Sequence, residues 1–548
     1  MVRKINIFLV FAALLIALSG LYSASATNTP EAGLMKSENV ISPEYSLSSQ
    51  PVFSQNTLPI DSSKREMRAV WIATVKNINL TAGMDEAAFK KWAYETCSAL
   101  KNANYNTVIF QIRPSGDALY NSTLNPWSSY ITGKNQGTNP GYDPLAIMVS
   151  AAHENSLELH GWINPFRVTM PSDKLSDLSE NNIAKKNPSW VIQYGSQHYL
   201  DPGIPQVREH LVKSVKEIVD NYDIDAIHID DYFYPYPVAG ETYDDSKSFA
   251  LYGTGYANLG DFRRDNITKL IRELNKTIKE SKYFVQLGIS PFGVWRNKAT
   301  DATGSETNAG HQCYDSLYAD TRKWIQEGII DYITPQIYWS TEFTAANFKV
   351  LTGWWEKEIM TQAASRPVNL YIGMADYKVN NNSDTKWNDP SEISNQIEIN
   401  RASNFIKGQM HYSLSAVMSN PIGYRDIVFN TKYNHIAITP STYWNNPLEP
   451  SLPESLTYSK AQDGIVLNIT SKDSNIRKYA IYRYEGSYVQ GYDDNKIIGI
   501  VYKNGDTTNF KDTSSEKGKF YSYAVRSISN TGVMSNQGSI ITSASRVN

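Results

Sequence analysis

Apolar runs of strand length alternate with segments of helical periodicity from about residue 66 to residue 440. The runs have the length expected of buried strands, and turn-forming or polar segments separate them. Eight such runs occur, at residues 67–74, 106–114, 157–165, 225–232, 284–292, 331–339, 368–377 and 408–414.

The segments between the runs carry apolar stripes at helical spacing, which predicts helices that bury one face against a sheet. Three stripes are clear: Phe89, Trp92, Ala93, Cys97 and Leu100; Val207, Leu211, Val215, Ile218 and Val219; and Ile267, Leu270, Ile271, Leu274 and Ile278.

Eight strands that alternate with helices predict an α/β fold, a closed (β/α)8 TIM barrel over residues 65–440. An open, doubly wound sheet is the alternative. However, no GxGxxG motif follows the first predicted strand, and no phosphate-binding loop is visible. The sequence therefore favours the closed barrel.

The pattern changes after the predicted barrel. Pro447, Pro450 and Pro453 mark a linker. Short strands separated by turn residues follow at 464–470, 478–486, 496–502 and 520–529. This spacing predicts an all-β sandwich within residues 447–548. The stretch YSYAVRSISNTGVMSNQGS resembles the hairpin between strands F and G of fibronectin type III domains.

The N-terminus has the pattern of a secretory signal peptide over residues 1–26. Arg3 and Lys4 precede an apolar run at 5–21, and small residues follow at 24–26. An uncleaved membrane anchor is the alternative, although the run is short for a membrane span. Residues 27–64 are rich in Ser, Asn, Pro and Thr, which predicts a disordered linker. We therefore expect a secreted or cell-envelope protein with no stable membrane insertion after cleavage.

Composition narrows the classes of partner. A chain of 548 residues is longer than one hydrophobic core usually serves, so more than one domain is expected. The formal net charge of -3 gives no electrostatic reason to expect a nucleic-acid partner. The 36 Tyr and 12 Trp supply rings that either fill cores or stack on sugars.

The two cysteines, Cys97 and Cys313, cannot form a disulfide scaffold. Cys97 falls on a predicted apolar helix face, which favours a buried free thiol, while a bond between the two remains open. No CxxC or HExxH motif is present, so neither a metal site nor a cofactor is expected.

Polar side chains gather at the C-terminal ends of the predicted strands, where the working groups of such barrels lie. Their accumulation at one end predicts the polar floor of a pocket, because unpaired polar groups inside the barrel would be costly. The candidate substrate-binding residues are Arg113, Asp117, Trp127, Asn164, Arg167, His228, Trp295, Gln336, Tyr338 and Trp339.

The segment DAIHIDDYFYPYP at 225–237 ends a strand on two acids. Alternation predicts that Asp230 points to the barrel axis and that Asp231 turns sideways toward a neighbouring loop. His228 lies one layer below Asp230 and is placed to orient it. A loop acid or helix cap is the alternative for Asp231, and a satisfied core histidine is the alternative for His228.

Carboxylates at strand ends with rings around the mouth suit glycoside hydrolysis. That reaction needs a protonated acid for the leaving oxygen and a second group as nucleophile or base. Asp230 is the first carboxylate. Asp376 and Asp117, at the ends of other strands, are candidates for its partner, and Asp231 is kept as a further catalytic candidate.

Five ordered motifs carry a resemblance: MRAVWIAT, QIRPSGDALY, GWINPFR, LDPG and IHIDDYFYP. Together they resemble a bacterial glycosyl-hydrolase-like family of exported (β/α)8 proteins, formerly a domain of unknown function. The resemblance covers about residues 66–440. It implies cleavage of cell-wall or related glycans, with peptidoglycan strands as the expected substrate. It also implies that Asp230 and Asp231 are the motif acids and that Arg113, Asp117 and Asn164 are pocket residues.

The segment DAIHIDDY also resembles the strand-four signature DGxDxDxE of chitinase-type barrels. In those proteins the final Glu is the acid, and the acetamido group of the substrate is the nucleophile. Here Tyr232 takes the position of the Glu and His228 that of the middle acid. This departure argues against the substrate-assisted mechanism.

Two other functions compete with a hydrolase. The first is a glycan-binding protein that keeps the pocket without turnover, favoured by the missing Glu at the end of the fourth strand. The second is a polysaccharide deacetylase, which needs a metal triad of one Asp and two His. No HxxxH motif sits at a strand end, which argues against it.

Overall fold

The computed structural model describes residues 65–171, 173–363, 366–489 and 491–545. The predicted signal peptide at 1–26 and the predicted linker at 27–64 lie outside the described residues. Residues from 65 onward belong to one compact unit.

Eight parallel strands close into a barrel, which confirms the predicted TIM barrel. Around the barrel the strands follow the order β1-β10-β9-β8-β7-β6-β3-β2. Their bounds are β1 Met67–Ile72, β2 Thr107–Arg113, β3 Glu158–Ile163, β6 Ala226–Ile229, β7 Gln286–Ile289, β8 Tyr332–Ile333, β9 Asn369–Met374 and β10 Ile406–His411.

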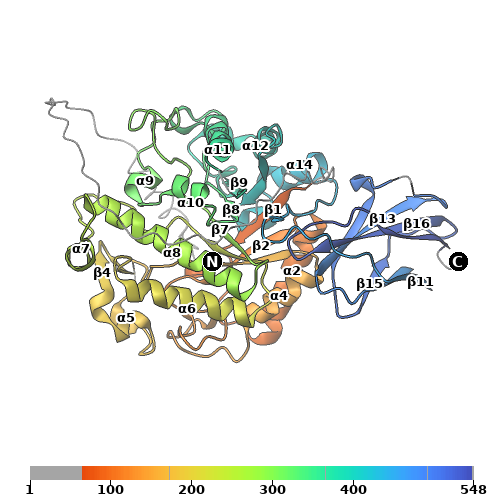
Figure 1. Cartoon of the computed structure of the whole chain (residues 1–548), viewed down its shortest axis with the longest axis horizontal. Coiled ribbons are helices and arrows are strands. Elements are labelled where there is room, and N and C mark those ends of the chain that lie inside the picture. Colours follow the sequence, from red (N-terminus) through yellow and green to blue (C-terminus); the bar gives the residue numbers. More distant parts are fainter. Residues whose placement is uncertain (1–64, 172, 364–365, 490, 546–548) are drawn as a thin grey trace, which may run out of the picture. The chain divides into compact units, whose positions relative to one another are not determined.

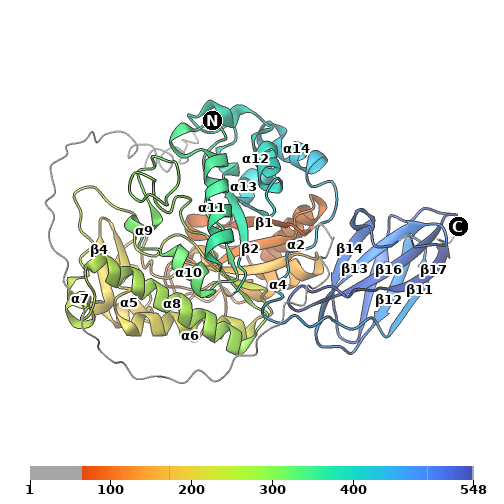
Figure 2. The same ribbon diagram turned by 45° about the horizontal axis from the view of Figure 1, so that its top comes forward.

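Helices surround these strands (Figures 1 and 2), and α6 and α8 run side by side along one flank. The predicted helical stripes are buried in α2, α6 and α8, except for the half-buried Trp92. Asp85 and Asn258 begin α2 and α8, because each side chain accepts a backbone N–H of the first turn. The main helices are α2 Glu86–Asn102, α4 Pro144–Glu154, α6 Pro205–Asn221, α8 Leu259–Ser281, α10 Thr321–Glu327, α11 Phe348–Gln362, α12 Glu392–Arg401 and α14 Tyr424–Thr431.

Alternation along the strands separates two cores. Outward-facing residues such as Ile227 and Ile229 pack with the helices in one large cluster. Inward-facing residues form a smaller cluster rich in aromatic rings, which includes Trp71, Trp162 and Tyr332. Ala226 belongs to this inner cluster, so the predicted alternation in the 225–232 strand is confirmed.

The ring of Tyr332 occupies the interior of the barrel, because the residue beside it on β7 is a glycine. Gly288 pairs with Tyr332 in the strand register. A Cβ atom at position 288 would meet Cζ of the Tyr332 ring at 1.8 Å. Only glycine therefore leaves room for this ring inside the barrel.

A segment after β3 contains a two-stranded hairpin that the apolar pattern did not predict. Its strands are β4 Val191–Tyr194 and β5 Gln197–Leu200, preceded by the short helix α5 Ile183–Lys186. Most of β4 is only partly buried, so its sequence lacks the continuous apolar run of a barrel strand. Further short helices are α3 Ser129–Thr132, α7 Ser246–Tyr252, α9 Cys313–Ser316 and α13 Leu414–Ser419.

The C-terminal region forms two antiparallel sheets, consistent with the predicted all-β sandwich. The sheets have the orders β11-β12-β15 and β14-β13-β16-β17, and residues of both sheets share one core around Leu467, Ile481 and Tyr523. The fibronectin type III assignment stays a prediction. The bounds are β11 Ser455–Ala461, β12 Gly464–Thr470, β13 Ile476–Glu485, β14 Ile497–Tyr502, β15 Thr507–Asp512, β16 Phe520–Ser529 and β17 Ser539–Ser545.

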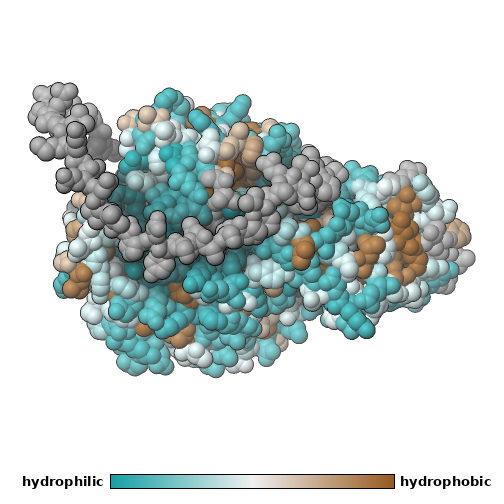
Figure 3. Space-filling model, in the orientation of Figure 1, coloured by the Kyte–Doolittle hydropathy of each residue, from teal (hydrophilic) through white to brown (hydrophobic). Residues whose placement is uncertain are grey.

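Three of these strands, β11, β15 and β17, were missed in the sequence. β11 shows why, because its seven residues are exposed or only partly buried and include polar side chains on both faces. In Figure 3 the barrel surface is mainly hydrophilic in this view, and hydrophobic patches lie over the sandwich.

Ion pairs join the sandwich to the N-terminal ends of two barrel strands. Lys478 Nζ lies 2.7 Å from Glu158 Oε1 at the start of β3, and Arg477 lies 2.8 Å from Asp225 just before β6. The ring of Tyr502 stacks on His153 with centroids 4.0 Å apart. The sandwich thus contacts the barrel at the end opposite to Asp230.

Cys97 and Cys313 are both buried and free, which confirms the expected state of Cys97 and answers the question of pairing. Within the described residues, no helix combines the length and the apolar character needed to cross a membrane.

Substituting Gly288→Ala should destabilise the protein strongly, because neither the strand nor the Tyr332 ring has space to move. Overpacking of this kind costs about 1–3 kcal/mol or more. Urea unfolding monitored by tryptophan fluorescence measures the loss.

Gly353→Ala is the matched control, since Gly353 is exposed on α11 and a Cβ there meets nothing within 4 Å. Alanine in a helix should raise stability by up to about 1 kcal/mol. Equal effects of the two substitutions would contradict the packing argument.

Candidate active site

Asp230 lies at the end of β6, and its carboxylate points into the barrel, as predicted. Trp162 Nε1 donates to its Oδ2 at 3.0 Å, and Asn164 Nδ2 donates to its two oxygens at 3.2 and 3.1 Å. The backbone N–H of Tyr232 donates to Oδ1 at 3.2 Å. The tip of β3 therefore supplies most of the donors that hold this carboxylate.

Asp231 turns to the other side, as the alternation predicts, and its carboxylate reaches a neighbouring loop. Gln336 Nε2 donates to its Oδ1 at 3.0 Å and also to the Ser290 carbonyl at 2.9 Å. The Tyr236 hydroxyl donates to its other oxygen. Two adjacent residues thus present carboxylates that different strands hold in place.

The two carboxyl groups differ in their electrostatic surroundings. Burial, followed by the negative charge of Asp230, raises the pKa of Asp231 to about 6. Burial also raises the pKa of Asp230, but the Arg167 charge and the donors from Asn164 and Trp162 oppose the shift. The pair therefore combines one acid that keeps its proton up to about pH 6 with a second carboxyl group whose ionised form the Arg167 charge supports.

Half-buried rings extend from this pair across the C-terminal ends of the strands. Tyr236 contacts Phe292 with centroids 6.2 Å apart, and Phe292 contacts Trp339 at 5.5 Å. The Arg167 guanidinium lies 4.6 Å from the ring centroid of Tyr232. The full set of half-buried rings is Tyr232, Tyr236, Phe292, Tyr338, Trp339, Tyr377 and Tyr412.

Among the predicted residues, Asn164, Arg167, Gln336, Tyr338 and Trp339 therefore gather around the acidic pair. Asn164 and Gln336 contact the carboxylates directly, and the Arg167 charge lowers the pKa of Asp230. The negative charge of Asp231 in turn raises the pKa of Tyr338, after burial and the neighbouring Tyr412 and Tyr377.

His228 is a satisfied core histidine, which confirms the alternative given for it, and its partners do not include Asp230. Its Nε2 accepts from Trp71 Nε1 at 3.1 Å and lies 2.9 Å from Ser290 Oγ. Its Nδ1 lies 2.9 Å from the Tyr332 hydroxyl. Burial lowers the pKa of His228 well below its usual value, so the ring is neutral.

Asp376 lies on the outer side of the barrel, between strands and helices. His411 Nδ1 lies 2.9 Å from its Oδ1, and His411 Nε2 lies 2.8 Å from the Tyr433 hydroxyl. Alternation from the inward-facing Tyr371 gives position 376 the outward side, and the chain enters a short helical turn at Asp376 after β9. The carboxylate that accompanies Asp230 is therefore Asp231 of its own strand, not the one expected from another strand.

Arg113 and Asp117 are fully buried around the loop after β2. Arg113 donates to the carbonyls of Asn164 and Pro165 at 2.8 and 3.2 Å. Asp117 accepts the backbone N–H of Ser115 at 2.9 Å. Arg113 thus supports the β3 loop that carries Asn164. The predicted Trp127 is half-buried nearby, and its backbone forms a bridge with Ala118.

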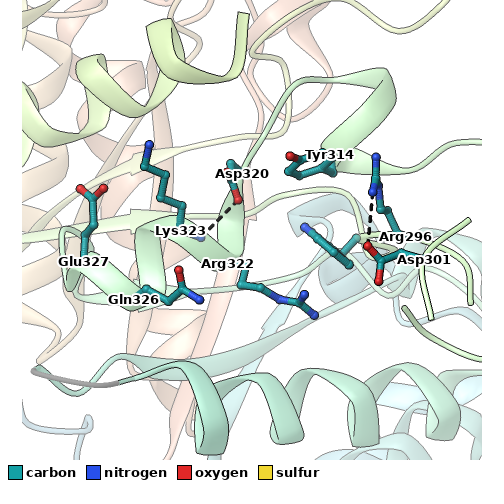
Figure 4. Close-up of a pocket in the computed structure, with 9 residues that line it drawn as sticks. Arg296, Asp301, Tyr314, Asp320, Arg322, Lys323, Gln326 and Glu327 are labelled. Atoms are coloured by element: carbon teal, nitrogen blue, oxygen red, sulfur yellow. Dashed lines mark hydrogen bonds and ion pairs between the residues drawn. The ribbon is translucent and has the colours of Figure 1, made fainter. Parts of the chain in front are cut away.

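Trp295 lines a pocket of about 410 Å³ whose lining contains neither acid of the pair (Figure 4). The Arg322 guanidinium covers its ring at 3.9 Å, and Trp354 stacks on it with centroids 5.8 Å apart. The apolar faces of this ring are thus in contact with protein side chains.

Several residues that build the site were not predicted. Trp162 donates to Asp230, and Tyr236 donates to Asp231. The pKa of Tyr412 is raised by burial and then by the negative charges of both acids. Trp162 is inside the motif GWINPFR, and Tyr236 follows the acids within DDYFYPYP. A search for hydrogen-bond donors, instead of acids alone, would have found them. Within the described residues, no group of three or more His, Cys, Asp or Glu is placed to hold a metal ion.

The profile of the glycosyl hydrolase-like 10 family matches residues 66–389, which covers the barrel from β1 past β9. The chain belongs to this family. The match includes Asp230, Asp231 and their partners from β3 and the loop after β8.

Two curated relatives extend the comparison. Glycosyl hydrolase YngK of Bacillus subtilis is 44% identical over 473 residues, which cover 85% of this chain and 91% of the relative. Glycosyl hydrolase DigH of Escherichia coli is 36% identical over 388 residues, 67% of this chain and 87% of the relative. Among solved structures, the β-amylase catalytic domain of Paenibacillus polymyxa is 13% identical over 68% of this chain and 99% of that chain, with a TM-score of 0.43.

The raised pKa of Asp231 makes stability depend on pH. In the native state this group keeps a proton that the unfolded chain releases near pH 4, so the free energy of unfolding falls as pH rises from about 4 through 6. Two pKa units correspond to about 3 kcal/mol. Asp231→Asn should remove this loss, so the variant gains stability relative to wild type as pH rises over this range. Chemical unfolding at several pH values measures the gain.

Asp244→Asn is the control, because Asp244 is exposed and its hydrogen bonds with Ser246 lower its pKa. It should show no such gain with rising pH. A difference between wild type and Asp231→Asn that stays constant from pH 4 to 7 would refute the raised pKa.

Proposed function

We propose that this protein is an exported glycoside hydrolase that cleaves glycosidic bonds in a bacterial cell-wall glycan, with peptidoglycan strands as its substrate. One observation carries the proposal. Asp230 and Asp231 stand side by side at the C-terminal end of a barrel strand, with opposed hydrogen-bond partners and different charges nearby.

In this proposal Asp231 is the general acid. Its pKa of about 6 lets it hold a proton in mildly acidic solution and transfer that proton to the leaving glycosidic oxygen. Tyr236 and Gln336 keep the carboxyl group in place during the transfer.

Asp230 is the anionic partner. Burial raises the pKa of Asp230, but the charge of Arg167 and the donors from β3 oppose the shift and support the ionised form, which in this proposal faces the positive charge that develops at the anomeric carbon. Asn164 and Trp162 fix the direction of the carboxylate.

The half-buried rings around the pair suit stacking on the apolar faces of sugar residues. A cell-wall substrate is consistent with the predicted signal peptide at 1–26 and with bacterial relatives named glycosyl hydrolases. Export and substrate are parts of the proposal.

A glycan-binding protein without turnover is the second candidate. The outward position of Asp376 favours it, because this carboxylate does not accompany Asp230 as the second group that glycoside hydrolysis needs. The same rings and donors would then hold a glycan without cleaving it.

Release of reducing sugar from purified peptidoglycan separates the two candidates. Asp230→Asn and Asp231→Asn should each lower kcat/KM by about 10²–10⁴, the usual contribution of acid–base groups. Binding of the glycan in a pull-down assay should persist. The wild-type rate should also fall as pH rises above about 6, where Asp231 loses its proton.

Asp376→Asn is the matched control, since it removes an equally buried carboxylate on the outer side of the barrel. It should lower the melting temperature and leave kcat/KM within about tenfold of wild type. If wild type binds but releases no sugar from any glycan offered, the hydrolase proposal fails. If Asp376→Asn alone abolishes turnover, the assignment of the pair fails.

A further inference from the structure

A hydrogen-bonded column of fully buried side chains crosses the barrel interior. His228 Nδ1 lies 2.9 Å from the Tyr332 hydroxyl, and His160 Nδ1 lies 2.9 Å from the same hydroxyl. His160 Nε2 then lies 3.4 Å from Glu158 Oε2. Three strands, β3, β6 and β8, therefore contribute to one chain of contacts.

Tyr332 is the central link of the column. Its hydroxyl joins the two histidines, and the absence of a side chain at Gly288 makes room for its ring. A polar column of this kind differs from the usual interior of a TIM barrel, which apolar side chains fill.

The donor Trp71 fixes the direction of every bond in the column. An indole N–H only donates, so His228 Nε2 accepts, and the neutral His228 ring carries its proton on Nδ1. His228 then donates to the Tyr332 oxygen, and the one Tyr332 proton goes to His160 Nδ1. His160 is left with its proton on Nε2, which points at Glu158.

The lower end of the column lies on the sandwich. Lys478 Nζ contacts Glu158 Oε1 at 2.7 Å, and the Thr439 hydroxyl donates to the same oxygen at 2.6 Å. Although burial opposes it, Lys478 and His160 lower the pKa of Glu158 to about 2. The sandwich thus supplies the cation that keeps the terminal acceptor ionised.

The upper end of the column reaches the acidic pair. Trp71 contacts Tyr412 edge to face with centroids 6.0 Å apart. Burial, followed by the negative charges of Asp231 and Asp230, raises the pKa of Tyr412. Ser290 Oγ lies 2.9 Å from His228 Nε2, and the Ser290 carbonyl anchors Gln336, which holds Asp231.

We propose that the C-terminal sandwich helps to organise the active site: Lys478 keeps Glu158 as the terminal acceptor of the column, and the column positions Trp71 and Ser290 beneath the acidic pair. This inference rests on the proposed hydrolase function for its kinetic consequences, but the column itself is measurable without turnover. Lys478, Glu158, His160, Tyr332 and His228 are positioning residues.

Removing the Lys478 charge should reverse part of the column. Without its cation Glu158 takes up a proton from solvent and donates in a hydrogen bond to His160 Nε2. The one proton of the neutral His160 ring then moves to Nδ1, which donates to Tyr332 instead of accepting. Tyr332 would face two donors and keep no acceptor for its own proton. The contact that holds His228, and through it Trp71, is then weakened.

The test compares Lys478→Met with Arg477→Met, because both side chains form buried ion pairs with the barrel and only Lys478 touches the column. In wild type, ¹⁵N NMR should show an unprotonated Nδ1 on His160 and an unprotonated Nε2 on His228. Lys478→Met should protonate His160 Nδ1 and lower kcat about fivefold with KM unchanged, the rate equivalent of one hydrogen bond.

Arg477→Met should lower stability, keep the wild-type ¹⁵N pattern and leave kcat within about twofold. Lys478→Arg should restore the pattern and the rate. Equal NMR and kinetic effects of the two methionine variants would overturn the inference, since both would then act by loosening the sandwich.

Tyr332→Phe is a second variant that keeps the ring and removes the shared hydroxyl. It should change the ¹⁵N signals of both histidines and lower kcat with little change in KM. Unchanged signals for His228 would overturn the inference. Absence of turnover in wild type would defeat the proposed function and leave the NMR test of the column intact.

Discussion

The burial of two adjacent carboxyl groups at the end of one strand is the constraint on which the rest of the site depends. A buried carboxylate without donors is costly, so each group needs its own partners. β3 supplies Trp162 and Asn164 to Asp230, whereas the loop after β8 supplies Gln336 to Asp231. The opposite partners make two identical side chains chemically different.

The barrel was predictable from the sequence because its strands are buried on both faces and stand out as apolar runs. All eight runs overlap a barrel strand, and the stripes of α2, α6 and α8 are buried as their spacing predicts, apart from the half-buried Trp92. The short hairpin β4–β5 and three strands of the sandwich, β11, β15 and β17, were missed, since partly exposed strands need no continuous apolar sequence.

The site was predictable only where alternation along a strand decides the direction of a side chain. That rule placed Asp230 and Asp231 correctly, and Gln336, Asn164 and Arg167 join them. Asp376 was chosen for its place at a strand end, but it has the outward parity of Ile372 and Met374, so alternation counted from Tyr371 would have excluded it. His228 points inward as the rule requires, but the partner beside it was Tyr332, which is remote in sequence.

The state of the two thiols has a practical consequence. Burial raises the pKa of the Cys97 thiol to about 12 and that of Cys313 further, so neither forms a reactive thiolate at neutral pH. Neither cysteine of the folded protein should therefore react with thiol reagents, whereas a molecule whose barrel has opened should be labelled at either position. The rate of cysteine labelling would thus measure how often the native barrel opens, with no need to introduce a new cysteine.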